Sequence, residues 1–164
     1  LKARLGRFEG NRLRLDARTV LVTREGPAAV QEAIVYLLKA KKVPALESSS
    51  ALDLAAQAHV RDLGPDGKVG HMGTDGSSPS DRMKRYAELK IASAENLTFG
   101  DNDPRGVVVQ LLIDDGVPNR GHRKNLFSTR FKVLGVACGP HKVYGRMCVM
   151  DFAGGAKARP SNRP

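Results

Sequence analysis

Apolar residues recur at helical spacing in several separate segments of the chain, and each segment is bounded by residues that favour helix ends. The first segment starts at Pro27, where the fixed φ of proline suits the first helical turn, and stops before Pro44. The second starts at the serines of 48–50, which are good N-cap residues, and stops at Gly64. The pattern predicts helices over about 27–42, 50–63, 80–86 and 104–113, with a loop over 64–80.

Apolar runs bounded by turn signals predict strands mainly in the last part of the chain. Segments 131–138 and 145–152 flank a Gly139-Pro140 turn signal, so we expect a hairpin that reverses near Val143. A brief strand is expected at 92–97, and weak alternation within 1–24 predicts a short hairpin. Because the helices come first and the strands mostly last, the pattern indicates an α+β domain built in layers, and 164 residues suit one such domain.

The net charge of +10 lies mostly at the two ends of the chain. Residues 1–24 carry +5 and residues 155–164 carry +3, which leaves +2 for the long middle segment. With 5% aromatic residues and no Trp, the body lacks the basic and aromatic stripe of nucleic-acid-binding domains, so we predict no nucleic-acid partner. We expect the ends to attract anionic surfaces weakly and to be dispensable for folding. No apolar run has the length of a membrane-spanning helix.

The two cysteines lie at mirrored positions of the predicted late hairpin. Cys138 and Cys148 have no CxxC spacing and no histidine at zinc-finger spacing, which excludes a zinc finger. A reversal near Val143 would place them opposite each other, at a separation that a disulfide can bridge. The sequence leaves two interpretations, a disulfide formed in an oxidising compartment or two buried reduced thiols.

Two of the four histidines have neighbours that suggest chemistry. His71 and His122 are flanked by glycines, which leave room for a side chain to point into a cleft. His59 lies in the middle of a predicted helix and is interpreted as a half-buried packing residue, and His141 is expected to be exposed in the hairpin turn. We therefore take His71 and His122 as candidate site residues.

Acidic residues in apolar surroundings complete the candidate cluster. Glu95 falls inside an otherwise apolar stretch, where a carboxylate must be paired or bear a desolvation cost. Asp114 and Asp115 end the predicted helix over 104–113. Two histidines and two carboxylates suit a divalent metal or acid–base chemistry, and the sequence has no GxSxG, HExxH or P-loop motif.

An ordered set of short motifs resembles the bacterial-type CAP domain, of the superfamily of cysteine-rich secretory, antigen 5 and plant pathogenesis-related proteins. The resemblance covers about residues 26–155, which leaves 1–25 as a basic N-terminal segment and 156–164 as a disordered tail. The matching segments, in chain order, are Ala55…His59…Asp62, Gly70-His71-x-Gly-x-Asp-Gly-Ser77, Arg82, Ala94-Glu95-Asn96-Leu97, the stretch from Asp114 to Arg123, Asn125-Leu126 and Met147-Cys148-Val-Met-Asp151-Phe-Ala-Gly-Gly155.

This resemblance implies an α-β-α sandwich with a central antiparallel sheet and a secreted or extracytoplasmic location. It also implies a cleft lined by His71, His122, Glu95 and Asp114, in which the two histidines bind zinc or another divalent cation. Asp114 stands where the classical eukaryotic members usually have Glu. The sequence also departs from the family pattern at Ala94, which replaces a usual Gly, in lacking a common Trp, and in the extra residues 117–119.

Two function classes follow from the resemblance. The first is a binding or signalling module with an unidentified protein or lipid ligand and a cleft that holds a divalent metal. The second is a metal-dependent hydrolase, a peptidase or esterase, in which Glu95 is the candidate general base. We expect the binding module.

Overall fold

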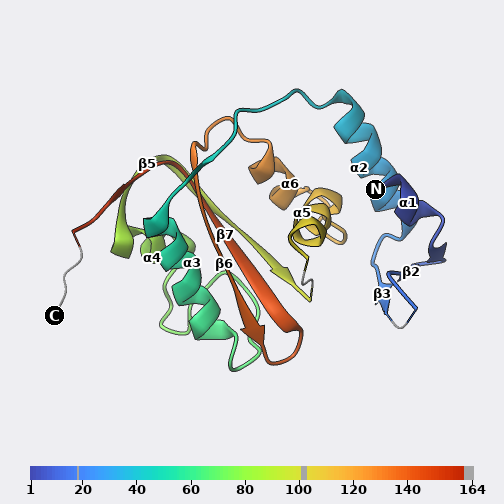
Figure 1. Cartoon of the computed structure of the whole chain (residues 1–164), viewed down its shortest axis with the longest axis horizontal. Helices are drawn as coiled ribbons and strands as arrows, with labels where there is room; N and C mark the ends of the chain where they lie inside the picture. Colours follow the sequence, from blue (N-terminus) through green and yellow to red (C-terminus); the bar gives the residue numbers. More distant parts are fainter. Residues whose placement is uncertain (18, 101–102, 161–164) are drawn as a thin grey trace.

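The computed structural model describes residues 1–17, 19–100 and 103–160, and its core is a four-stranded sheet between two layers of helices (Figure 1). The strand order is β4-β6-β7-β5, with β4 parallel to β6 and the remaining pairs antiparallel. The strands are β4 (Glu47–Ser48), β5 (Ala87–Phe99), β6 (Val133–His141) and β7 (Gly145–Ala158). This arrangement confirms the predicted α-β-α sandwich.

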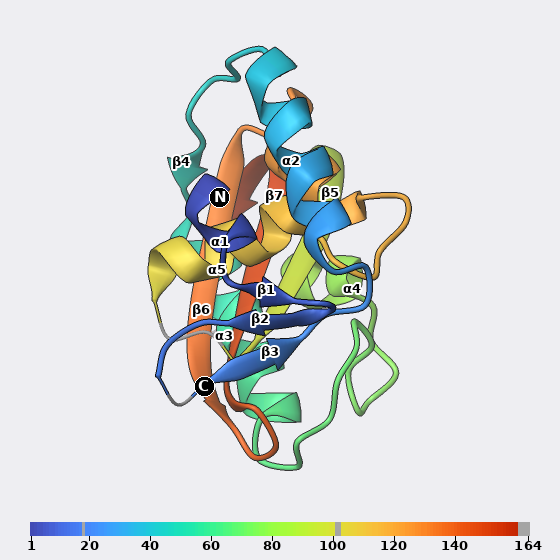
Figure 2. The same ribbon diagram turned by 90° about the vertical axis from the view of Figure 1, so that its right-hand side faces the viewer.

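Helices cover both faces of this sheet. In Figure 1, α3 and α4 lie on one side of the sheet, and α5 and α6 lie on the other. The N-terminal elements stand outside α5, and Figure 2 shows their three-stranded sheet in front of the main sheet. The helices are α1 (Lys2–Leu5), α2 (Pro27–Lys39), α3 (Ser50–Leu63), α4 (Pro79–Tyr86), α5 (Pro104–Ile113) and α6 (Gly121–Leu126); the outer strands are β1 (Phe8–Glu9), β2 (Arg12–Arg14) and β3 (Val20–Val22). None of these helices is long and apolar enough to cross a bilayer.

Local side-chain caps explain where the helices begin. The Ser49 hydroxyl accepts from the backbone N–H of Leu52 at the start of α3. Ser78 and Asp81 form a reciprocal capping box at the start of α4, and Asp103 accepts from the N–H of Gly106 at the start of α5. These caps satisfy N–H groups that have no partner within the helix.

Both faces of β7 are buried, and its side chains alternate between two cores. Met147 and Val149 pack against α3, whereas Cys148, Met150 and Phe152 pack on the α5 side. Side chains of a strand alternate between the faces, so a strand covered on both sides is apolar at nearly every position. This explains why the sequence of β7 reads as a continuous apolar run.

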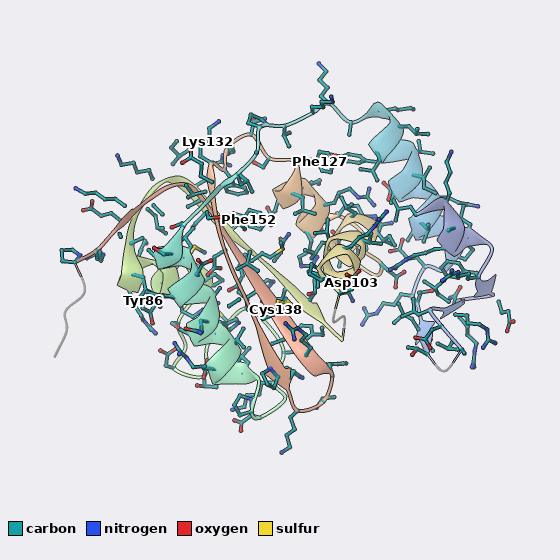
Figure 3. All side chains as sticks on the ribbon, in the orientation of Figure 1. Tyr86, Asp103, Phe127, Lys132, Cys138 and Phe152 are labelled. Carbon is teal, nitrogen blue, oxygen red and sulfur yellow. A yellow bond between two sulfur atoms is a disulfide. The ribbon has the colours of Figure 1, made fainter. Side chains whose placement is uncertain are left out.

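The predicted late hairpin and its disulfide are both present. β6 and β7 pair so that Cys138 lies opposite Cys148, and the two are disulfide-bonded; Figure 3 labels Cys138 and Phe152 on the sheet. The interpretation as two reduced thiols is therefore wrong.

Gly135 of β6 lies where α3 crosses the sheet, and a Cβ there would overlap the backbone of Leu52 and Asp53.

Several expected boundaries differ from the structure. α2 ends at Lys39 rather than near 42, β5 starts at Ala87 rather than near 92, and the short elements α1, β4 and α6 were not predicted. His141 is 2% exposed rather than in solvent, because its Nε2 bonds the carbonyl of Lys68 and its ring packs on Phe99 and Tyr144.

The two basic ends are also more ordered than the sequence indicated. Leu1, Leu5 and Phe8 pack against a buried cluster on α2, and Leu13 of β2 is 1% exposed, so the N-terminal segment contributes to a core. β7 continues through 156–158 and pairs with the start of β5. Of the predicted disordered tail, residues 161–164 lie outside the described residues.

Candidate functional site

His71 lies on the loop between α3 and α4, and residues of α3 hold that loop in place. Asp62 accepts from the backbone N–H and the hydroxyl of Thr74. His59, fully buried in α3, donates from Nε2 to the carbonyl of Gly70 at 2.9 Å. Burial lowers the pKa of His59, so it remains neutral and keeps one ring N–H for this bond. His59 is thus more deeply buried than predicted, and it supports the residue next to His71.

Glu95 contacts the Nδ1 side of the His71 ring. The Nδ1 of His71 donates to one carboxylate oxygen of Glu95 at 2.7 Å, and Arg82 donates to the other at 2.7 Å. The Glu95 side chain is 1% exposed, whereas that of His71 is 47% exposed. Burial by itself raises the pKa of Glu95, but the bond from His71 and the positive charge of Arg82 outweigh it and hold that pKa below its ordinary value. Glu95 is therefore an ionised, fully engaged carboxylate.

Asp151 is a second buried acid that the candidate set omitted. It lies opposite Glu95 in the β5–β7 pairing and is 1% exposed. Burial, followed by the negative charge of Glu95, raises the pKa of Asp151 to about 8, so it is protonated at neutral pH. The signal that identified Glu95, an acid within an apolar run, is equally present around Asp151 in the sequence.

Asp114 holds His122 in the corresponding way. Asp114 is the C-cap of α5, with a left-handed φ of 57°, and is 4% exposed. Its carboxylate accepts from His122 Nδ1 at 2.6 Å and from the backbone N–H of His122 at 2.9 Å. His122 is the second residue of α6, not part of a loop as expected, and Asn96 donates to its carbonyl at 3.0 Å.

Asp115, the other acid at this helix end, does not join the site. Its carboxylate accepts from the backbone N–H groups of Arg24 and Glu25, at 2.7 and 2.8 Å. Adjacent acids thus have separate tasks, since Asp114 orients a histidine and Asp115 anchors the N-terminal segment.

The structure brings His71 and His122 together as a histidine pair. Their ring centroids are 6.5 Å apart, and the rings are inclined by 32°. Because each Nδ1 is bonded to a carboxylate, each ring has its Nε2 left to bind a ligand. Across residues 1–17, 19–100 and 103–160, no hydrogen bond engages either Nε2.

The donor chemistry of the pair fits a divalent metal ion. Metal-binding histidines commonly donate their second ring N–H to a carboxylate, which fixes the tautomer and makes the free nitrogen a better ligand. Glu95 and Asp114 have this arrangement with the two rings. Within the described parts of the chain, no group of three or more His, Cys, Asp or Glu residues has a geometry that could hold a metal ion, so the protein would supply the two imidazoles alone.

Comparison with solved structures identifies two proteins of similar fold. An extracellular protein containing an SCP domain from Bacillus anthracis str. Ames is 20% identical, with a TM-score of 0.56 over 77% of this chain and 40% of that one. An outer surface protein of Borrelia burgdorferi is 19% identical, with a TM-score of 0.58 over 80% of this chain and 90% of that one. The chain thus spans about two fifths of the Bacillus protein.

Sequence comparison gives the family. No curated protein matches the sequence as a relative. The model of the cysteine-rich secretory protein family, CAP, matches residues 9–152 and so includes most of the chain, the histidine pair and both of its carboxylates. The chain belongs to the CAP family of cysteine-rich secretory proteins.

Proposed function

We propose that this CAP domain is an extracytoplasmic binding or signalling module whose ligand site is the histidine pair, and that the pair binds a divalent cation such as zinc. The observation that carries the proposal is the presence of two imidazoles from separate segments, each oriented by a buried carboxylate, with ring centroids 6.5 Å apart. The disulfide favours an oxidising compartment, and the two structural neighbours are an extracellular and an outer surface protein.

The chemistry of the residues supports weak, exchangeable binding. Neutral imidazole is a good zinc ligand, and a bound zinc ion would supply a Lewis acid with open coordination positions. His71 and His122 would hold the ion, while Glu95 and Asp114 would orient them. An incoming protein or small-molecule group could occupy the open positions, which suits a binding module.

The hydrolase alternative receives less support from the geometry. A general base needs a carboxylate oxygen that reaches the attacking water. Both oxygens of Glu95 are engaged, one by His71 and one by Arg82, and the side chain is 1% exposed. Glu95 is therefore better suited to orient His71 than to deprotonate water.

A zinc titration tests the proposal. Calorimetry should detect binding to the wild-type protein, and His71→Ala or His122→Ala should each weaken it at least about tenfold. Val69→Ala is the matched control, because Val69 is 59% exposed on the same loop and its side chain has no ligand atom. Glu95→Gln should weaken binding through lost orientation of His71. Equal affinity in the wild type and both histidine variants would overturn the metal site.

A substrate screen separates the two function classes. Zinc-loaded wild-type protein and Glu95→Gln are compared on ester and peptide substrates. The binding module predicts no turnover in either protein. Turnover that Glu95→Gln abolishes would instead establish the hydrolase.

A further inference from the structure

Two large apolar side chains are exposed at the C-terminal end of α2. Val35 is 51% exposed and Leu38 is 76% exposed, and their spacing of three residues places both on one face of the helix. The helix buries its other face, which carries Ala29, Val30 and Ala33. Figures 1 and 2 show that this end of α2, with the segment that follows it, is an extremity of the molecule. Exposed apolar side chains that lie together commonly mark an interaction surface.

Positive charge surrounds this helix end. Residues 33–46 include three lysines and no acidic residue. The lysines are all exposed, and across the described parts of the chain none of them forms an ion pair; they are Lys39, Lys41 and Lys42. Glu32, the preceding acid on α2, pairs instead with Arg120 and Arg123. The end of α2 therefore combines exposed apolar side chains with uncompensated positive charge.

A further exposed apolar side chain lies among basic residues at an irregularity of β5. Ile91 is 77% exposed and has a left-handed φ of 68°, within the register shift of the β5–β7 pairing. A β-branched residue rarely adopts this conformation, and such strained positions are often functional. A Cβ on Gly154 would meet both Ile91 and the carbonyl of Arg130, so these two residues are neighbours. Lys90, Arg130 and Lys132 are exposed there, and no ion pair engages them within the described residues.

Both groups of residues lie along the same end of the molecule. Residues 40–46 join α2 to β4, where the backbone N–H of Glu47 donates to the carbonyl of Lys132. Figure 3 labels Lys132 at this end. The basic residues here all belong to the middle of the chain, where the sequence is nearly balanced in charge. The fold therefore concentrates positive charge on one surface, which we call the basic end; it consists of the lysines of 39–42, Lys90, Arg130, Lys132 and the apolar residues among them.

A partner of the basic end must be anionic, and the shape of the surface favours a membrane. The apolar side chains project from a helix end and a strand irregularity rather than lining a groove. A bilayer needs no matching shape, because apolar side chains enter its headgroup region while lysine and arginine side chains contact lipid phosphates. We propose that the basic end docks on a bilayer that contains anionic phospholipid, with Leu38 and Ile91 inserted. The histidine pair takes no part in this contact, so the proposal is independent of metal binding.

Tryptophan fluorescence tests the insertion, because the chain has no Trp of its own. In Leu38→Trp and Ile91→Trp the emission should shift to shorter wavelength with phosphatidylcholine vesicles that contain about one quarter phosphatidylglycerol, and not with phosphatidylcholine alone. Val143→Trp is the matched control, because Val143 is 66% exposed in the β6–β7 turn, at the other end of β6 from Lys132, and its emission should not change. No shift in the first two variants, or an equal shift in Val143→Trp, would overturn the proposal.

Vesicle sedimentation tests the charge. One triple variant reverses the lysines at and after the end of α2: Lys39→Glu, Lys41→Glu and Lys42→Glu. A control variant makes the same change of net charge at exposed lysines elsewhere: Lys68→Glu, Lys84→Glu and Lys142→Glu. The first variant should bind the anionic vesicles at least about tenfold more weakly than the wild type, whereas the control should lose less than about threefold.

Two results of the sedimentation experiment would contradict the proposal. Equal losses in the two triple variants would show attraction by net charge alone. Binding of the wild type to soluble polyglutamate but not to the anionic vesicles would assign the basic end to an acidic protein partner. Circular dichroism of each variant verifies that it is folded.

Discussion

Each imidazole of the histidine pair donates to a buried carboxylate, and the two carboxylates differ in their surroundings. Asp114 sits at a helix end and accepts N–H groups from both the ring and the backbone of His122. Glu95 instead shares its pocket with Arg82 and with Asp151 on the neighbouring strand. Two adjacent buried carboxyls cannot both ionise cheaply, so Asp151 holds a proton while Glu95 stays charged.

This proton makes stability depend on pH through Asp151. Its pKa rises from an ordinary 3.8 to about 8 on folding, so the folded state keeps a proton that the unfolded state releases. The stability tied to this group is complete below about pH 4 and is lost as pH rises toward 8. The side chain of the Asp151→Asn variant cannot ionise. The melting temperature of this variant should therefore rise relative to that of the wild type as the pH increases from 5 to 8. A difference in melting temperature that stays constant across this pH range, measured by circular dichroism, would contradict the assignment.

At the scale of elements, the β6–β7 hairpin forms the two inner strands of the main sheet. It pairs in register from Val133 to His141, and its disulfide lies on the side of the α5 core. A hairpin also holds itself together through its ladder of hydrogen bonds, so the covalent link acts mainly on the unfolded chain.

Reduction of the disulfide should therefore cost little. The cysteines are 10 residues apart, which closes a short loop, so we expect a loss near the lower end of the typical range, about 2 kcal/mol. Denaturant unfolding with and without a phosphine reductant measures this difference, and alkylation with mass spectrometry verifies the redox state. Alkylatable thiols in the native, unreduced protein would show that the link does not form.

At the scale of the whole molecule, the N-terminal segment is built into the domain. Asp115 accepts backbone N–H groups of Arg24 and Glu25, and Arg120 pairs with Glu25 at 2.6 Å. That bond and the N–H of Gly116 lower the pKa of Glu25 to about 2. The segment also forms one wall of an apolar pocket whose other walls come from β5 and α5.

A core substitution tests this integration. Leu13 is 1% exposed, so Leu13→Ala should lower the free energy of unfolding by about 2–5 kcal/mol. Val22→Ala, on the exposed side of the same small sheet, should change it by less than about 0.5 kcal/mol. Equal, small effects of both in denaturant unfolding would restore the view that the basic N-terminus is dispensable for folding.

The sequence by itself determined the helices α2 to α5 and the late hairpin, because their signals are local. A helical period with a Ser or Asp cap needs no distant partner to be recognised, as in α3, and α4 and α5 add a Pro in the first turn. The motif order also predicted the family, and it singled out His71, His122, Glu95 and Asp114, which the structure places in two His–carboxylate contacts. The two-residue β4 was not predicted, because its pairing with β6 depends on a distant segment.

Tertiary structure decided the chemistry of the site. The ring nitrogen that is free on His71 depends on a contact with Glu95, 24 residues further along the chain, and the meeting of the two His–acid pairs depends on the fold as a whole. The protonation of Asp151 follows from its burial and then from its register with Glu95, neither of which a single strand encodes. The burial of His141 and Leu13 depends in the same way on what folds over them. Burial and electrostatics are sums over neighbours in space, and only the folded chain specifies those neighbours.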